Sequence, residues 1–350
     1  MVKSRRLFLL TLVLMGILLS ATVAVAGCGG GTTTTTAATT AAQDTSQVIG
    51  NRALKIFSSN QVGGEFGANS ITADNLSKKL ADPAQKAGLY LLDVRSKAAY
   101  DKGHIEGATQ VDFAQWAAPE NLNKLPKDKT IIVICYTGNT AAQTTAGLRM
   151  LGFNANALKG GMTSWSQTDA SNTQIADLEA ATFPDVTTPA GASTPAPPAT
   201  PFEKPSDADY TVLAAKANSV MSSMATSGDY ANFTITPTKL NEKLSGADKD
   251  KLFLLDIRKT EDFNKGHIDG ATHIDFAAVA VPDNLKMLPK DKKIVVICYT
   301  GNTAAQANMV LDMLGYDAVV MKNGMLGWDG QGKQAVIQAI QSANKPVVTS

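Results

Sequence analysis

The chain has 350 residues, with 32 lysines and arginines against 31 aspartates and glutamates, and three cysteines. This length suggests two domains of ordinary size with additional segments. A formal net charge of +1 gives no electrostatic reason to expect a nucleic-acid partner. Three cysteines are too few for a disulfide framework, and no Cys/His cluster has metal-site spacing, so neither a metal nor another cofactor is predicted.

The first 27 residues are typical of an export signal. Lys3, Arg5 and Arg6 precede an uncharged, mostly apolar run over 7–26, and small residues stand just before Cys28. This end of the run resembles a bacterial lipobox, in which the cysteine is lipidated and becomes the mature N-terminus. The run is also long enough to be an uncleaved membrane anchor. Both interpretations predict an exported chain held at a bacterial membrane, on its periplasmic or outer face.

Residues 28–47 are interpreted as a tether rich in glycine and threonine, and its uncharged part over 29–42 is expected to be disordered. A short helix is expected over 48–57. Thr72 is placed to cap a helix over 73–80, with Asp74 favourably placed in its first turn.

Residues 48–182 are predicted to form a first domain of alternating strands and helices, which is typical of an open, mostly parallel α/β sheet. Apolar runs favour strands at 89–94, 131–134 and 156–159, with a further strand at 109–113. Helices are expected at 97–102, 114–122 and 141–151.

A linker is predicted over 183–206, because half of the fourteen prolines lie between 184 and 205. Such a segment cannot form the interior of a sheet and tends to be extended. A second domain follows over 207–350 and begins with a helical segment at 207–224. Residues 163 positions apart then match without interruption: Asp93 and Asp256, His104 and His267, Cys135 and Cys298, Trp165 and Trp328. The period is that of a duplicated whole domain, far longer than a solenoid repeat.

One nine-residue stretch, Cys-Tyr-Thr-Gly-Asn-Thr-Ala-Ala-Gln, occurs at 135–143 and again at 298–306. Each copy follows a strand-like apolar run and leads into a helix-like segment. Backbone N–H groups in such a loop, with the helix N-terminus, favour a thiolate, which is the nucleophilic form of cysteine. A cysteine at a strand end can also be a small core residue. The polar, glycine-containing loop and its unchanged repetition favour a reactive cysteine.

Each copy resembles a rhodanese domain, the fold of the sulfurtransferases, over about 70–168 and 235–330. The first copy carries Asp93-Val94-Arg95 with Gly103-His104-Ile105-Glu106-Gly107-Ala108, then the cysteine loop, then Gly160-Gly161 with Trp165. The second copy repeats these motifs, with Asn323-Gly324 in place of the two glycines. The resemblance implies two tandem α/β domains, each with a five-stranded parallel sheet flanked by helices.

The resemblance also implies a sulfurtransferase that works through a cysteine persulfide. Cys135 and Cys298 are then the nucleophiles. The substrate-binding residues implied are those of the two loops: Tyr136, Thr137, Gly138, Asn139, Thr140, Tyr299, Thr300, Gly301, Asn302 and Thr303. A donor such as thiosulfate or a persulfide would give up its outer sulfur, and a thiol or cyanide would accept it.

Other shared residues are predicted to support the fold. An internal ion pair is expected between Asp93 and Arg95, and between Asp256 and Arg258. His104 and His267 are expected to be structural, and Trp165 and Trp328 to be packing anchors. His273 stands where the first copy has Gln110 and is interpreted as incidental. Asn323, where the first copy has Gly160, tolerates a left-handed backbone better than other residues with a side chain.

Two alternatives remain open at this point. Some members of this fold are cysteine phosphatases, which need a longer loop that closes with an arginine. Here Ala141 and Ala304 follow the loops, which argues against that activity. The other alternative is a non-catalytic sulfur carrier that holds persulfide for a partner protein of sulfur metabolism. The loops lack the basic residue usual in thiosulfate-specialised members, so thiosulfate is not singled out as the donor.

Overall fold

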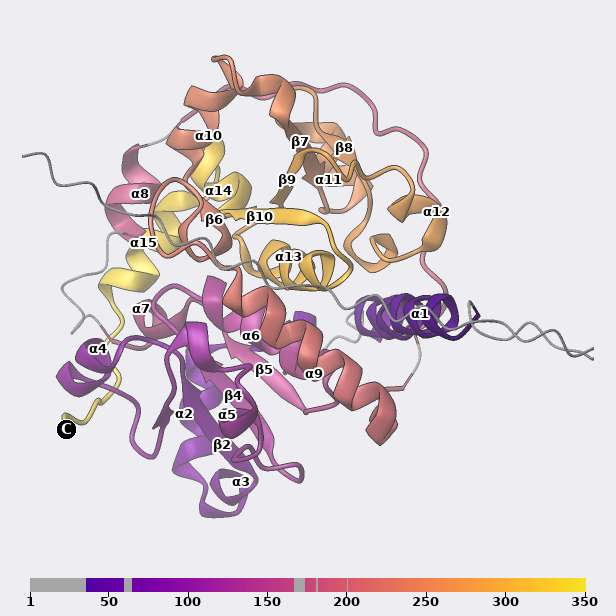
Figure 1. Ribbon diagram of the computed structural model, residues 1–350. Helices are drawn as coiled ribbons and strands as arrows, with labels where there is room; N and C mark the ends of the chain where they lie inside the picture. The colour runs from indigo at the N-terminus through magenta and orange to yellow at the C-terminus, as the bar shows by residue number, and fades with distance from the viewer. Residues whose placement is uncertain (1–35, 60–64, 167–173, 181, 200) are drawn as a thin grey trace, which may run out of the picture. The chain divides into compact units, whose positions relative to one another are not determined.

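The computed structural model describes residues 36–59, 65–166, 174–180, 182–199 and 201–350 (Figure 1). Residues from Ala41 to Ser350 form one compact unit, separate from the segment up to Thr40. The export signal and Cys28 lie outside the described residues. Among the helices that the structure describes, none is long and apolar enough to cross a membrane.

Helix α1, Thr36–Ser59, replaces much of the expected tether. The prediction of disorder is therefore wrong from Thr36 to Ala42. Four alanines in its first seven residues favour a helix. Farther along, Ile49, Ala53, Ile56 and Phe57 are buried at helical spacing, so the core holds one face of α1.

The first domain is a five-stranded, all-parallel sheet with the strand order β1-β5-β4-β2-β3. Its strands are β1 Ser70–Ile71, β2 Leu89–Asp93, β3 Thr109–Gln110, β4 Thr130–Ile134 and β5 Ala155–Leu158. Its helices are α2 Ala73–Ala81, α3 Pro83–Ala87, α4 Lys97–Lys102, α5 Pro119–Leu122, α6 Asn139–Met150 and α7 Gly161–Trp165. Helix α8, Gln174–Ala180, follows in the chain, but its Leu178 packs with Ile337 and Ile340 of the second domain. The predicted α/β class and five-stranded parallel sheet are confirmed.

Central strand β4 is buried on both faces, as its apolar run predicted. Ile131 and Val133 pack into the core cluster that also contains α6, while Ile132 and Ile134 pack into a second cluster on the other face. The strand ends at Ile134, so Cys135 lies at the carboxyl edge of the sheet. Ligand sites of parallel sheets form at this edge.

One predicted pair of elements differs from the structure. The strand expected at 109–113 ends at Gln110, and the helix expected at 114–122 is divided into a 3₁₀ turn at Phe113–Gln115 and helix α5. Pro119 explains the division, because it lacks the N–H that would continue an earlier helix and is suited to a first helical position.

The second domain repeats this architecture with the strand order β6-β10-β9-β7-β8, again all parallel. Its strands are β6 Thr234–Ile235, β7 Leu252–Asp256, β8 Thr272–His273, β9 Lys293–Ile297 and β10 Asp317–Met321. Its helices are α9 Asp207–Ser222, α10 Pro237–Leu244, α11 Thr260–Lys265, α12 Pro282–Leu285, α13 Asn302–Met313, α14 Gly324–Trp328 and α15 Lys333–Gln341.

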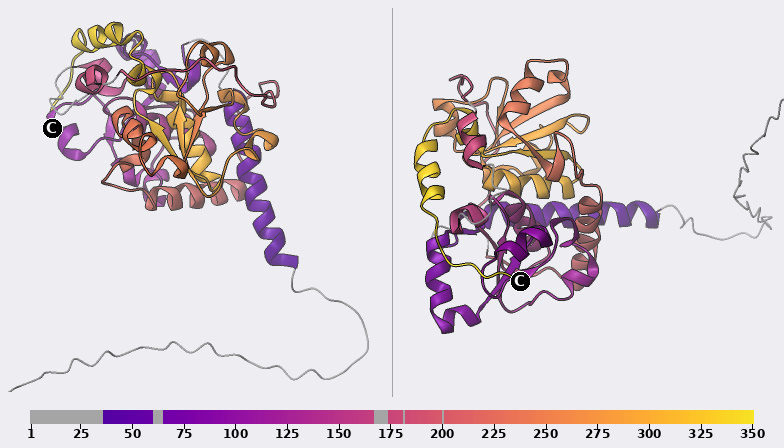
Figure 2. Two further views of the ribbon diagram at one scale, coloured as in Figure 1. Left: turned by 90° about the horizontal axis from the view of Figure 1, so that it is seen from above. Right: turned by 90° about the vertical axis from the view of Figure 1, so that its left-hand side faces the viewer.

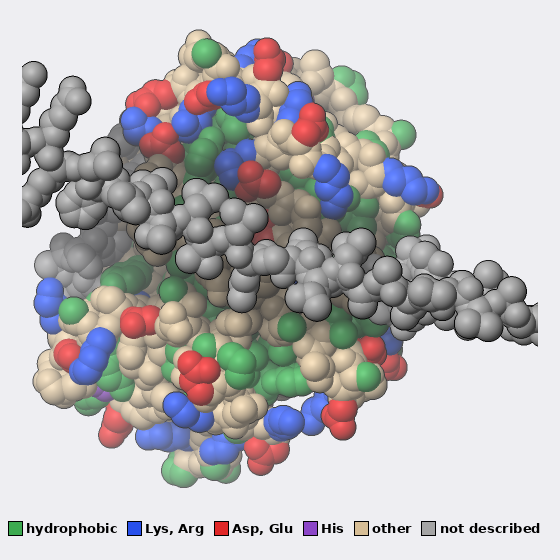
Figure 3. Space-filling view, in the orientation of Figure 1, with side chains coloured by type: hydrophobic (Ala, Val, Ile, Leu, Met, Phe, Trp, Pro, Cys, Tyr) green, Lys and Arg blue, Asp and Glu red, His purple; other side chains and the backbone are tan. Residues whose placement is uncertain are grey.

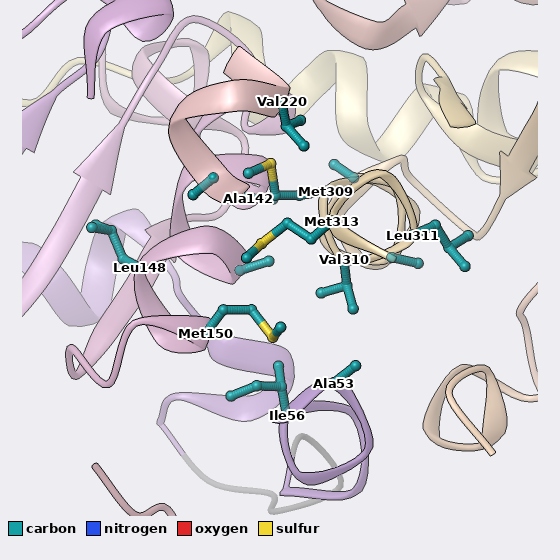
Figure 4. Packing of buried hydrophobic residues seen from close by; sticks show 14 of the residues in the cluster. Ala53, Ile56, Ala142, Leu148, Met150, Val220, Met309, Val310, Leu311 and Met313 are labelled. Atoms are coloured by element: carbon teal, nitrogen blue, oxygen red, sulfur yellow. The ribbon is translucent and has the colours of Figure 1, made fainter. Parts of the chain in front are cut away.

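The two domains share one hydrophobic core where α6 packs against α13. Met309 and Met313 extend from α13 toward α6, whereas Leu311 points to the opposite side of α13 (Figure 4). A buried hydrogen bond of 2.7 Å, from Gln143 Nε2 to Asn308 Oδ1, joins the same two helices. Both helices begin directly after a cysteine loop, so this packing fixes the two loops relative to each other.

The linker is extended, as predicted, and it lies along the second domain. Phe183 N donates to Trp328 O, and the Trp328 indole N–H donates to Pro184 O at 3.2 Å. Val186 then forms an antiparallel bridge with His267. The predicted packing role of Trp328 is thus combined with a hydrogen bond to the linker.

The C-terminal tail makes the same contacts with the first domain. Lys345 N donates to Trp165 O, the Trp165 indole N–H donates to Pro346 O at 2.8 Å, and Val348 bridges His104. Figure 2 shows this yellow tail reaching the first domain. The linker therefore binds the second domain, and the C-terminal tail binds the first. We call residues 183–186 the linker strap and residues 345–348 the C-terminal strap.

On the face drawn in Figure 3, acidic and basic side chains are interspersed over both domains. This distribution agrees with the formal net charge of +1.

Candidate active site

The first cysteine loop forms a cradle of hydrogen-bond donors around Cys135 Sγ. Gly138 N donates to Sγ at 3.0 Å. Gly138 has φ of 97°, a left-handed conformation that favours glycine, and it directly precedes α6. The other donors to the sulfur are the Thr140 hydroxyl and the backbone N–H groups of Thr137 and Ala141. The loop backbone and Thr140 lie where the resemblance placed the donors.

The second loop repeats the cradle around Cys298 Sγ. Gly301 N donates at 3.1 Å and Ala304 N at 3.3 Å, and Gly301 has φ of 90°. Backbone donors therefore converge on each sulfur both from the loop and from the start of the following helix. Such a cradle stabilises negative charge on sulfur or on an attached group.

Burial, however, raises the pKa of the Cys135 thiol above its ordinary value. The side chain is 1% exposed, and removal from water disfavours the charged form. The hydrogen bonds from the loop lower the pKa, but they offset only part of this effect. The loop donors thus favour the thiolate, as expected, but the expectation left out burial, whose larger effect makes the net pKa shift of Cys135 upward.

A tight turn, at 160–161 in the first domain and at 323–324 in the second, packs against the backbone of each cysteine loop. Gly160 has φ of 76°, and Asn323 takes the same left-handed conformation with φ of 59°, as predicted. A Cβ on Gly161 would lie 2.5 Å from Cys135 O, and a Cβ on Gly324 would lie even closer to Cys298 O. Glycine is required at these second positions because the backbone of the turn touches the backbone of the loop.

The expected ion pairs are present and buried. Arg95 Nη2 contacts Asp93 Oδ2 at 2.7 Å, and Arg258 Nη2 contacts Asp256 Oδ2 at 2.8 Å. Arg95 Nη2 also donates to Gly103 O, and Arg258 Nη2 donates to Gly266 O. Each of these glycines directly precedes a histidine. These pairs therefore tie the end of β2 or β7 to the following turn.

The histidines make contacts within their own turns. The His104 ring stacks on Tyr100 with centroids 3.6 Å apart, and the His267 ring stacks on Phe263 at 3.7 Å. In each case Nδ1 lies 2.9 Å from the carbonyl oxygen four residues earlier. These contacts are those of structural residues.

His273 has a defined contact, which corrects its interpretation as incidental. Its Nε2 lies 2.8 Å from Arg258 O, and Gln110 Nε2 donates to Arg95 O at the same distance. The two different side chains therefore hold equivalent backbone positions next to the buried ion pairs.

The hydroxyl groups of the two loop tyrosines form hydrogen bonds with residues outside the loops and not with the sulfur atoms. Tyr136 OH lies 3.1 Å from Ser96 Oγ, and Tyr299 OH donates to Asp262 Oδ2 at 2.6 Å. Burial, with the neighbouring Asp262 carboxylate, raises the pKa of Tyr299 to about 12. Asn302 Oδ1 accepts from Gln306 Nε2 at 3.0 Å, so this amide also serves the loop's own structure.

Residues of the second domain complete the site at Cys135, which sequence reasoning missed. A cavity of about 450 Å³ is lined by the first cysteine loop and by Asp229, Asn232, Lys239 and Lys322. No local pattern in the sequence marks these residues, because only the packing of α6 on α13 brings them opposite Cys135.

A second cavity, of about 510 Å³, adjoins both loops without being lined by either cysteine. Thr137 and Asn139 border it from the first loop, and Thr300 and Asn302 from the second. One wall is the apolar side of α15, including Val336 and Ile340. In the part of the chain that the structure describes, no group of three or more metal-binding side chains is gathered at a site.

The model of the rhodanese-like domain matches residues 72–168 and 236–331, more than half of the chain. The putative sulfurtransferase YtwF of Bacillus subtilis is 34% identical over 99 residues, which are 28% of this chain and 92% of that protein. The thiosulfate sulfurtransferase GlpE of Pseudomonas entomophila is 30% identical over 105 residues, 30% of this chain and 94% of that protein. A solved rhodanese-like domain protein from Staphylococcus aureus is 29% identical and covers 27% of this chain and 89% of its own, with a TM-score of 0.25. Because the family model matches both domains and more than half of the chain, the chain belongs to the rhodanese-like domain family.

Proposed function

We propose that the chain is a sulfurtransferase that carries sulfane sulfur as a persulfide on Cys135 and Cys298. The observation that carries the proposal is the cradle of N–H donors around each Sγ. A persulfide ends in an anionic sulfur, and preorganised donors stabilise such a charge without reorganisation. The sulfurtransferase relatives support the same chemistry.

The reaction has two balanced steps. The cysteine thiolate attacks the outer sulfur of the donor, the bond between that sulfur and the rest of the donor breaks, and its electron pair leaves with the departing anion. With thiosulfate the departing group is sulfite, and with a persulfide it is a thiolate. Cyanide or a thiolate then takes the outer sulfur, and the cysteine thiolate is restored.

A non-catalytic sulfur carrier is the second candidate, and one observation favours it. Burial raises the pKa of Cys135, which lowers the thiolate fraction available for attack at neutral pH. A carrier would receive sulfur from a partner protein of sulfur metabolism and would not need fast turnover of small donors.

Turnover separates the two candidates. The full chain, purified in detergent, is supplied with thiosulfate or glutathione persulfide and with cyanide, and thiocyanate is measured. Repeated turnover that disappears only when Cys135 and Cys298 are both serine supports the enzyme. A single round of sulfur loading without turnover supports the carrier, and no transfer in any form would oppose both.

The phosphatase alternative gains nothing from the site. The residues after the two loops, Ala141 and Ala304, are fully buried at the start of α6 and α13. An arginine that clamps phosphate has no counterpart there. The reaction proposed is therefore sulfur transfer.

We also propose that the protein is exported and tethered to a bacterial membrane through a lipid on Cys28, with residues 1–27 removed. The basic start, the apolar run and the small residues before Cys28 support this. The measurement is the mass of the N-terminal peptide from the bacterial membrane fraction. A diacylglycerol-modified Cys28 is expected, and an intact Met1 would favour the uncleaved anchor.

A further inference from the structure

The cavity at Cys135 is built by both domains, and its basic side chains all come from the second one. The loop itself, 135–140, contains no lysine or arginine. Across the cavity, however, lie Lys239 of α10 and Lys322, which directly follows β10. Asp229 is the acidic residue of the lining.

Lys322 is the cavity lysine whose charge is left uncompensated. Lys239 pairs with Glu242 at 2.7 Å, and Asp229 pairs with Lys243 at 3.0 Å. The ammonium of Lys322 forms no ion pair or hydrogen bond with any residue that the structure describes, and its side chain is half-buried. An unpaired ammonium on a half-buried side chain that lines the same cavity as the nucleophile is suited to bind an anion.

We propose that Lys322, with help from Lys239, binds the sulfonate group of a dianionic sulfane-sulfur donor of the thiosulfate class at Cys135. This inference rests on the proposed function and names the donor class of one of its two sites. The Cys135 thiolate attacks the outer sulfur, the sulfur–sulfur bond of the donor breaks, and sulfite leaves with the bonding electron pair. Lys322 holds the sulfonate oxygens in the donor and in the departing sulfite. The basic residue that the loop lacks is thus supplied by the other domain.

The first domain offers fewer lysines to Cys298 than the second domain offers to Cys135. The two sites should therefore prefer different donors. In the aligned first domain, the counterpart of Lys239 is Asn75, next to the matching helix cap Thr72. The counterpart of Lys322 is Lys159, which is exposed to solvent and lines the other cavity. The dianion preference is therefore assigned to Cys135.

The experiment isolates Cys135 by using the full chain with Cys298→Ser as the parent. Two donors are compared, with cyanide as the acceptor: thiosulfate, and the methanethiosulfonate anion, in which a methyl group replaces one charged oxygen. Intact mass first establishes that the parent adds one sulfur from either donor. A parent that takes sulfur from neither donor would overturn the proposed function at this site, and the present inference with it.

The variant Lys322→Gln is then made in this parent. We expect its kcat/KM for thiosulfate to fall about tenfold or more, mainly through KM, because a hydrogen bond to a charged group is lost. The fall with methanethiosulfonate should be clearly smaller, because that donor carries one charge instead of two. Lys322→Arg should restore most of the thiosulfate activity, since it keeps the positive charge.

Lys286→Gln is the matched control, because Lys286 is an exposed lysine of the second domain that pairs with Asp283. It should leave both donors unaffected. Lys239→Gln provides a second variant on an exposed side chain, and it should lower thiosulfate activity by a smaller factor. If Lys322→Gln keeps its thiosulfate KM, or loses both donors equally while melting like the parent, the inference is wrong. If Lys322→Gln does not fold, Lys239→Gln is compared with the parent on the two donors. A larger loss with thiosulfate than with methanethiosulfonate supports the inference, and equal losses overturn it.

Discussion

The side-chain carbonyl of Gln306 accepts a hydrogen bond from the Asn69 amide at 3.0 Å, and its own amide donates to Ala68 O at 2.8 Å. These residues are more than 230 positions apart in the chain. Gln306 lies in the first turns of α13, directly after the Cys298 loop. One side chain thus fastens the first domain to the helix that positions Cys298.

Gln306→Ala should loosen this junction and destabilise the protein. Asn69 is buried, and an unpaired buried polar group costs about 1–3 kcal/mol. The expected result is a lower urea midpoint and a slower rate at Cys298 than at Cys135, each measured with the other cysteine as serine. Gln143→Ala is the comparison: it removes the hydrogen bonds from Nε2 to Asn308 Oδ1 and Asn232 O, but the Gln143 carbonyl oxygen has no partner to lose in the described structure. An unchanged midpoint for Gln306→Ala would contradict this role.

The C-terminal strap should stabilise the first domain although it leaves the second. A chain that ends at Ala343 loses the tail, and with it the bridge to His104 and the acceptor of the Trp165 indole N–H. We expect a lower melting temperature and a red shift in tryptophan emission as Trp165 becomes hydrated. A chain that ends at Val348 keeps these contacts and serves as the control. Equal melting of the two truncated chains would show that the strap contributes nothing.

The raised pKa of Cys135 predicts slow alkylation at neutral pH. In the Cys298→Ser chain, the iodoacetamide rate should keep rising with pH beyond the ordinary thiol pKa of about 8.5, because burial disfavours the thiolate. The measurement is the pH profile of the rate by intact mass, with free glutathione as the reference. A plateau already below the glutathione midpoint would instead indicate an activated thiolate.

Asp185 on the linker should make stability depend on pH. Burial, together with the Asp329 carboxylate, raises its pKa from 3.8 to about 6. Between these values the folded chain keeps a proton that the unfolded chain has lost, so stability falls as pH rises through this range. Asp185→Asn removes the charge and should be more stable than the parent at pH 7, but equal to it near pH 3.

The melting temperature of Asp185→Asn across pH 3–8 tests this, beside Asp283→Asn as an exposed control. Asp185 is part of the strap that bridges His267, so hydrogen exchange at Val186 should slow in the variant at pH 7. If the difference in melting temperature between the parent and Asp185→Asn is the same at pH 4 and at pH 7, the prediction is contradicted.

Much of each domain could be predicted because its signals are local. The buried apolar runs gave the positions of β2 and β4, and Thr72 caps α2 through a hydrogen bond to Asn75 N. The cysteine loop was predictable for the same reason, since Gly138 and the start of α6 lie within a few residues of Cys135.

The features that join the domains could not be predicted from such signals. Lys322 lines the same cavity as Cys135 only because α6 packs on α13, and no pattern near Lys322 indicates this. The straps depend on Pro184 and Pro346 meeting indoles far away in the chain. The direction of the Cys135 pKa shift depends on how completely the fold excludes water, which the loop sequence alone does not reveal.

The most direct test of the persulfide mechanism is the intact mass of four chains after incubation with thiosulfate and, separately, glutathione persulfide. These are the parent, Cys135→Ser, Cys298→Ser and the double variant. We predict one added sulfur on each single variant, two on the parent and none on the double variant, with every added sulfur removed by cyanide. Sulfur retained by the double variant, or no sulfur on any chain from either donor, would contradict the proposal that Cys135 and Cys298 carry the sulfur.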